Sequence, residues 1–313
     1  MKFRKLPIWA LALSILAGSG CVSDDYNYAK EGAYGTVSFA LEADSNITSG
    51  EITRADGESS NATIEIAEAL GAGESFDATK LTENFTVKVL DSSKKKTLKE
   101  CLLKDYKPED LSLELGTYYV QASYDPQKIG FYVVGQDGKP TEASGLPAFE
   151  GEAMFTITSE DAESETPKQV PIEVALKNSI LRIKCTDIFT KYFSEYSAVV
   201  TQSTADDAPS VSYDQAKIAL DSDVDAVAEG AFLEPVKTYI AYTFKPNPNQ
   251  AQGTNATDKT GIVGGADAGV KLNAKSCHTV IFDVQNIGGV DKLTITFDDT
   301  VTTVDIGDIE INE

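Results

Sequence analysis

Apolar and polar residues alternate with a period of two along most of this chain. Alternation over four to eight residues is typical of half-buried strands, because successive side chains point to opposite faces of a sheet. The clearest stretches are 37–41, 85–89, 111–115, 118–122, 155–157, 170–176, 181–185, 240–244, 280–284 and 293–297. We therefore expect half-buried antiparallel strands from about residue 35 to the end of the chain.

Turn chemistry and helical periodicity refine this picture. Asn286-Ile287-Gly288-Gly289 and Asp298-Asp299-Thr300 each separate two alternating runs, which predicts two tight hairpins. Helical spacing is scarce. It predicts a short helix over 188–196, one turn over 107–111 and a marginal helix over 62–70.

About a dozen strands and few short helices indicate an all-β protein. A length of 313 residues suits two domains of roughly 150 residues each. We predict two tandem β-sandwich domains, over residues 35–176 and 177–313. Segments 43–84 and 245–276 read as long connections, and 159–169 reads as a solvated acidic loop.

The first 20 residues have the three parts of a secretory signal peptide. Lys2, Arg4 and Lys5 form a basic start, an apolar run follows, and small residues precede Cys21. The apolar run is too short for a spanning helix, which needs about 20 residues. The segment resembles a bacterial lipoprotein lipobox, although Gly18 stands where that motif usually has Leu. The resemblance implies lipidation of Cys21, which would anchor the mature chain in outer-membrane lipid.

The residues after Cys21 suggest a surface location. Ser23-Asp24-Asp25 resembles the short acidic tag of Bacteroidetes lipoproteins that are displayed on the outer face of the outer membrane. We read 21–34 as a lipidated tether. Removal of residues 1–20 would take away three basic and no acidic side chains, so the net charge would change from -22 to -25. This charge repels anionic headgroups, so the protein should stand off the membrane.

Composition excludes several functions. The acidic balance argues against nucleic-acid binding, which needs clustered Lys and Arg. His278 is the only histidine, so a His-pair zinc site cannot form, and no G-x-S-x-G elbow supplies a nucleophile. We expect no enzyme activity and no cofactor. Cys101, Cys185 and Cys277 remain after lipidation, an odd number that excludes a closed disulfide framework. Cys185 and Cys277 are expected to be buried free thiols, with a Cys185–Cys277 pair left open.

Some residues are candidates for ligand contact or modification. Asp221, Asp223 and Asp225 have the spacing of a calcium loop but lack its Gly and Glu, so an acidic surface turn fits better. Thr300 follows Asp299 in a triplet that resembles a Bacteroidetes O-glycosylation site. Aromatic rings stack on sugars. The candidate glycan contacts are Tyr124, Phe131, Tyr132 and Phe149, although the mature chain has no Trp and these rings also suit a sandwich core.

Three stretches resemble a known family: 145–158 (GLPAFEGEAMFTIT), 174–200 (VALKNSILRIKCTDIFTKYFSEYSAVV) and 277–311, with its LTITFDDTVTTVDIGDIEI end. Together with the lipobox, they look like an uncharacterised Bacteroidales lipoprotein family that carries a domain of unknown function. That family is broadly similar to fimbrillin-like surface proteins. The resemblance implies two transthyretin-like or immunoglobulin-like sandwiches on the cell surface, and no reaction.

The fimbrillin resemblance directs attention to Arg54. Fimbrillin pilins are cut after an Arg in an early loop, and loss of the first strand opens a groove that a neighbouring subunit fills. Arg54-Ala55 lies about a dozen residues after the first alternating run, where such a cut would fall. Arg182 is the other arginine of the mature chain and lies in a predicted strand. Arg54 also fits an ordinary loop cation.

These features lead to a functional expectation. We expect a non-catalytic cell-surface lipoprotein that acts as a fimbrillin-like adhesion or assembly subunit, with like subunits as partners. The alternative is an accessory glycan-binding outer-membrane lipoprotein. An assembly subunit needs a removable strand, whereas a glycan binder needs a fixed aromatic platform.

Overall fold

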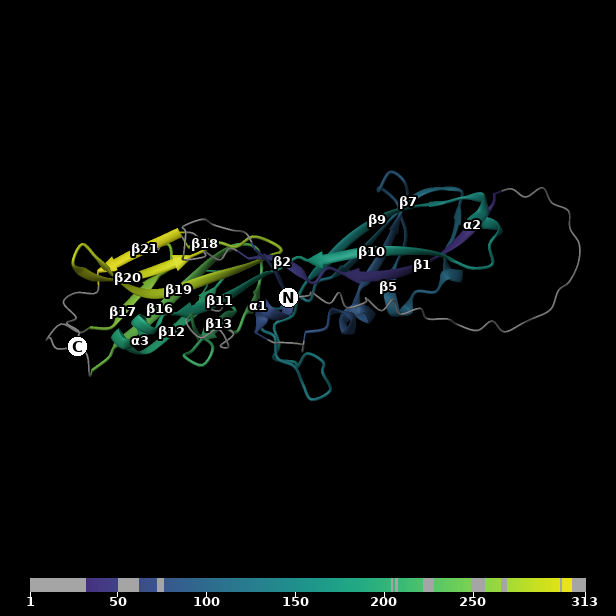
Figure 1. Cartoon of the computed structure of the whole chain (residues 1–313). Helices are drawn as coiled ribbons and strands as arrows, with labels where there is room; N and C mark the ends of the chain where they lie inside the picture. The colour runs from purple at the N-terminus through teal and green to yellow at the C-terminus, as the bar shows by residue number, and fades with distance from the viewer. Residues whose placement is uncertain are drawn as a thin grey trace, which may run out of the picture.

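A computed structural model shows an all-β protein in which the two ends of the molecule carry separate groups of strands (Figure 1). It describes residues 32–49, 62–71, 76–203, 205, 208–221, 228–248, 257–265, 269–298 and 300–305. The signal segment, Cys21, Arg54, Ala55, Asp223 and Asp225 lie outside these residues.

The first group is a mixed sheet in the order β5-β4-β7-β9-β10-β1-β6. Its strands are β1 (Tyr34–Ala43), β4 (Thr86–Leu90), β5 (Thr97–Leu102), β6 (Ser112–Glu114), β7 (Gly116–Tyr124), β9 (Phe149–Ile157) and β10 (Lys168–Leu176). β7 and β9 pair along nine residues, but β9 and β10 pair only at Phe149–Leu176 and Glu150–Ala175. Inward side chains from both parts of the sheet share one core, so the sheet folds over on itself like a sandwich.

Gly151 lies where β9 diverges from β10. A Cβ at this position would stand 2.1 Å from the carbonyl oxygen of Glu173 and 2.9 Å from a methyl of Val174. These distances are shorter than any real Cβ contact, so only glycine fits without a backbone shift. Gly151 therefore allows the two strands to cross closely.

The second group consists of two sheets with a core between them. One follows the order β21-β20-β19-β11-β15-β8, and β14, β2 and β3 join its strands. Its strands are β11 (Ser179–Cys185), β15 (Ala231–Leu233), β19 (Ser276–Ile287), β20 (Val290–Phe297), β21 (Thr300–Asp305), β8 (Gly130–Phe131), β14 (Ala219–Leu220), β2 (Asn46–Ser49) and β3 (Ala62–Glu65). The other contains β12 (Phe193–Thr201), β13 (Ser210–Tyr213), β16 (Lys237–Pro246), β17 (Lys259–Ile262) and β18 (Val270–Lys271).

The helices of the described residues are short. They are α1 (Ile66–Leu70), α2 (Ser159–Glu163), α3 (Asp187–Tyr192) and the 3₁₀ turns η2 (Ala78–Asn84), η3 (Leu103–Asp105) and η4 (Pro108–Asp110). The Thr158 hydroxyl accepts from the Asp161 N–H, and the Asp161 carboxylate accepts from the Thr158 N–H, which forms a capping box at α2. Lys168 adds an ion pair to Asp161 at 2.9 Å.

The all-β prediction and both hairpins are confirmed. β19 and β20 meet at Ile287–Val290, and β20 and β21 meet at Phe297–Thr300. The expectation of antiparallel pairing throughout is wrong, because β1 pairs with β10, and β11 with β19, in parallel. Connections in parallel pairs are long crossovers and leave no turn signal in the sequence.

Some local predictions also need correction. Residues 62–65 form β3 rather than a helix, because pairing with β2 outweighs local propensity. The predicted acidic loop at 159–169 contains α2, and the helix predicted over 188–196 ends at Tyr192. The segments read as long connections contain β2, β3, α1, η2, β17 and β18.

The boundary predicted at 176–177 falls between β10 and β11. Two hydrogen bonds fix this link. The side-chain carbonyl of Asn178 accepts from the N–H of Ala148, and the backbone carbonyl of Asn178 accepts from the N–H of Lys275 at 3.0 Å. Strands β2, β3 and β8 come from the first half of the chain but pair in the second group. The division into two domains stays a prediction.

The cysteines are free thiols in the described residues. Cys185 lies in the core between the two sheets of the second group, whereas Cys277 packs into the core of the first. The Cys185–Cys277 pair that the sequence left open is therefore not formed.

Replacing Gly151 with Ala should destabilise the first sheet, because the new methyl group would meet the Glu173 carbonyl. We expect a loss of about 3 kcal/mol in the free energy of unfolding, measured by urea denaturation. Gly135→Ala is the control, since its nearest neighbour, 3.1 Å away, is the end of the Asp137 side chain, which can move. Equal stability of the two variants would contradict the close crossing.

The cap of α2 should loosen in acid. The hydrogen bond from Lys168, together with those from Thr158, lowers the pKa of Asp161 from 3.8 to about 2. Since the folded pKa is depressed, the carboxylate stabilises the fold above the ordinary pKa, and this contribution is lost as the pH falls from about 4 through 2. NMR titration of the Asp161 carboxyl carbon should give a midpoint near pH 2. A midpoint near 4 would contradict the capping geometry.

Candidate functional site

Strand β1 has a complete partner on one edge only. It pairs in parallel with β10 from Val37 to Ala43. On its other edge, β6 pairs with it only from Tyr34 to Thr36. Within the described part of the chain, no strand continues this edge beyond Thr36.

Backbone direction shows which groups face the incomplete edge. The Asp44 N–H donates to the Val174 carbonyl at 2.8 Å, so even-numbered residues of this segment turn their backbone groups toward β10. Both backbone groups of one strand residue point to the same side. The odd-numbered residues from Val37 onward therefore direct theirs to the other edge.

The side chains of β1 complete the core of the first sheet. Val37 is fully buried, and Phe39, Leu41 and Ala43 are partly buried against the same cluster. The Phe39 ring lies 6.3 Å from that of Phe155 and 4.8 Å from that of Tyr106, measured between centroids. Loss of β1 would leave the β10 edge unpaired and an apolar trough above the core.

Tyr106 lies at the incomplete edge of β1. Its hydroxyl donates to the Val37 carbonyl at 3.1 Å. Burial raises the pKa of this phenol well above its usual value, which itself lies far above neutral pH, so the hydroxyl is a donor at neutral pH. No sequence pattern singled out Tyr106, because a contact across 69 residues leaves no local signal.

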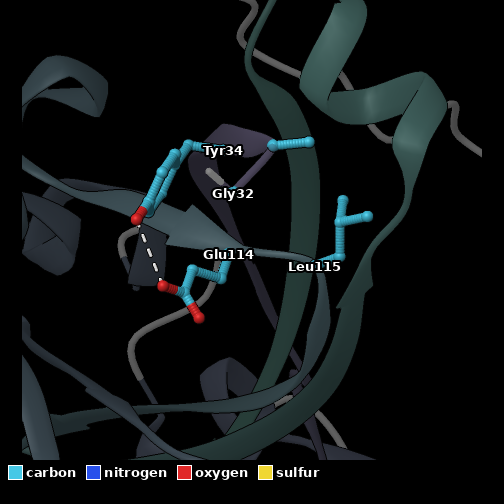
Figure 2. A pocket seen from close by; sticks show the side chains of 5 residues that line it. Gly32, Tyr34, Glu114 and Leu115 are labelled. Carbon is cyan, nitrogen blue, oxygen red and sulfur yellow. Dashed lines mark hydrogen bonds between the residues drawn. The ribbon is translucent and has the colours of Figure 1, made fainter. Parts of the chain in front are cut away.

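An open hollow of about 500 Å³ lies at the start of β1, lined by Gly32, Ala33, Tyr34, Glu114 and Leu115. Figure 2 shows the Tyr34 hydroxyl joined to the Glu114 carboxylate, with Leu115 on the other side of the hollow. This hydrogen bond is 3.1 Å long and raises the pKa of the Tyr34 phenol. Tyr34 and Leu115 are each 48% exposed. Sequence analysis did not identify this hollow.

The four aromatic candidates for glycan contact do not form one platform. Phe149 is 1% exposed and packs against Phe85, so its ring offers no face to solvent. Tyr124 stacks on Phe85 at 5.6 Å. The neighbours Phe131 and Tyr132 pack against different cores. Glycan contact by the partly exposed rings stays a prediction.

The other predicted residues are dispersed. Thr300 begins β21 and is exposed, which leaves its glycosylation a prediction. Asp221 follows β14, and its carboxylate lies 3.8 Å from the Lys184 ammonium. Asp223 and Asp225 lie outside the described residues, so the calcium candidate stays a prediction. No group of three or more metal-ligating side chains occurs in the part of the chain that was described.

His278 is engaged in packing. Its Nδ1 lies 2.6 Å from Asp298, and its Nε2 accepts from the Asn273 N–H at 2.9 Å. Its ring stacks on Phe297, and its side chain is 4% exposed. Both ring nitrogens are therefore occupied, and this arrangement fixes the turn at Asp298 to the start of β19.

Within the described ranges, no helix is long and apolar enough to cross a membrane.

Truncation of Phe39 should weaken the attachment of β1. Phe39→Ala removes the contacts with Tyr106 and Phe155, and we expect a loss of about 3 kcal/mol in unfolding free energy. Glu42→Ala is the control on the exposed side of the same strand and should change stability by less than about 0.5 kcal/mol. Equal effects in a urea titration would show that β1 is not part of the core.

Solved structures with remote likeness come from Bacteroides and Parabacteroides species. A "putative cell adhesion protein" from Bacteroides ovatus has 10% identity and a TM-score of 0.36, over 90% of this chain and 100% of that chain. A fimbrial assembly protein from Parabacteroides distasonis has 12% identity and a TM-score of 0.33, over 71% and 91%. "Putative polysaccharide binding proteins" from Bacteroides thetaiotaomicron have 11% identity and a TM-score of 0.32, over 86% and 98%. These values are too low to bear on function.

Comparison with curated proteins found none that matches significantly. A family model, in contrast, matches residues 34–313, which is nearly the whole of the described structure. The match begins at the first residue of β1 and includes both groups of strands. The chain therefore belongs to the family described as "Domain of unknown function (DUF4493)".

Proposed function

We propose that this protein is a non-catalytic subunit of a cell-surface adhesive assembly, of fimbrillin type, in which β1 is exchanged for a strand of a neighbouring copy. In this proposal, Cys21 carries the lipid that holds the newly exported chain at the outer membrane, and like subunits are its partners. Surface display follows from the lipidated start and the acidic tag.

The pairing of β1 supports strand exchange more than any other observation. Seven residues of β1 pair with β10, whereas β10 has only two paired residues with β9. Removal of β1 would therefore leave most of β10 without a neighbour in the described residues. An extended segment with apolar residues at every second position would restore both the ladder and the core, as in β-strand addition.

Arg54 is the proposed processing point. It lies after β1 and β2 in the chain, so a cut between Arg54 and Ala55 would place both strands on the released segment. Arg182 offers little competition, because it is 4% exposed within β11. In this proposal, an Arg-specific protease therefore cuts at Arg54 and not at the buried Arg182.

Treatment of soluble protein that begins at Val22 with an Arg-specific protease tests this function. We expect one cut at Arg54, loss of the segment that contains β1, and growth into oligomers, followed by intact mass and native size. Arg54→Gln should remain uncut and monomeric under the same conditions.

Two outcomes would contradict the proposal. One is resistance of the folded chain to cutting. The other is a cut chain that stays a folded monomer with its first segment bound. In either case the accessory glycan-binding function becomes the one to test, by glycan screening of wild-type protein against Tyr124→Ala.

A further inference from the structure

The incomplete edge of β1 needs protection before any exchange takes place. Odd-numbered residues from Val37 onward direct backbone N–H and C=O groups toward an edge without a strand neighbour in the described residues. An unpaired edge of this kind is a template for premature pairing with another chain, and natural proteins cover such edges with loops.

The segment from η3 to η4, residues 103–110, lies along this edge. It is fixed at one end by the Leu103 N–H, which donates to the Phe85 carbonyl at 2.7 Å. At the other end, Asp110 lies 3.5 Å from Lys99, and Leu111 is buried. The segment is thus held to Phe85 and to β5, and it continues into β6, which itself pairs with β1. Tyr106, which lies between its two turns, contacts β1 directly.

Tyr106 makes two contacts with β1. Its hydroxyl donates a hydrogen bond to the Val37 carbonyl, which is the first acceptor on this edge beyond the residues paired with β6. Its ring packs on Phe39 at 4.8 Å. A strand that approached this edge would have to displace the hydroxyl, and β1 can leave only if both contacts break.

Tyr118 provides a matched comparison. Its ring stacks on Phe155 at 5.7 Å, and Phe155 is also the neighbour of Phe39. Its hydroxyl also donates to a backbone carbonyl, that of Glu114, at 3.0 Å. Both hydroxyls donate to a backbone carbonyl, but the Tyr106 acceptor lies in β1, whereas the Tyr118 acceptor lies in β6 and is more exposed.

We infer that Tyr106 is a latch that controls the release of β1, through its hydroxyl on the Val37 carbonyl and its ring on Phe39. The inference rests on the proposed function, because it concerns the regulation of the same strand exchange. The latch slows departure of β1 from the cut chain and blocks strand addition to the uncut chain.

Tyr106→Phe keeps the ring and removes only the hydroxyl, so it should fold normally. In cut protein that begins at Val22, the segment ending at Arg54 should dissociate about fivefold faster in Tyr106→Phe than in wild type, the effect expected for one net hydrogen bond. Tyr118→Phe should release the segment at the wild-type rate. If the segment is released, equal release rates in Tyr106→Phe and wild type, or in Tyr106→Phe and Tyr118→Phe, would overturn the latch.

Hydrogen exchange on the uncut chain separates failure of the latch from failure of strand exchange. Tyr106→Phe should speed amide exchange in β1 and β10 about fivefold and leave β4 and β7 unchanged. If the cut segment is never released but this local effect is present, the latch stands and the proposed function fails. If release occurs and exchange in β1 does not respond to Tyr106→Phe, the latch fails and the proposed function stands.

Discussion

The parallel pairing of β1 with β10 is the interaction on which the first half of the molecule depends. It joins residues 37–43 to residues 168–174, so about 125 residues of chain separate the partners. A parallel pair cannot be closed by a tight turn. β10 has little other strand pairing, since it pairs with β9 at two residues only and β9 leaves it at Gly151.

This dependence makes β1 both necessary and exposed. Its side chains fill the core, but its backbone is paired fully on one edge only. A strand held by one ladder can be replaced by a strand of similar pattern without disturbing β4, β7 or β9. In our proposal, the Tyr106 latch protects this edge through its hydrogen bond to Val37 and its ring contact with Phe39. The proposed exchange of β1 and its proposed protection both rest on the same incomplete pairing.

The sequence predicted those features that depend on neighbours in the chain. Period-two alternation located ten strands, among them β1, β10 and β19, and the Gly288-Gly289 pair located a hairpin, because both signals are local. The parallel pairing of β1 with β10 was not predictable, because the long connection between them leaves no turn signal in the sequence. Residues 62–65 were misread as a helix because pairing between β2 and β3 decides their conformation. Phe149 was predicted as a glycan contact because aromatic residues near loops fit a core and a sugar site equally well, and it is buried. Tyr106 was missed since its partner is 69 residues away.

Native-state hydrogen exchange across a range of low urea concentrations tests the central claim most directly, because it measures the free energy at which each strand opens. The account predicts that the amides of β1 that face β10 exchange through a local opening, several kcal/mol below the global unfolding free energy. The amides of β7 and β9 should then exchange only with global unfolding. If β1 exchanges only together with β7 and β9, it is an inseparable part of the fold, and strand exchange at this edge is contradicted.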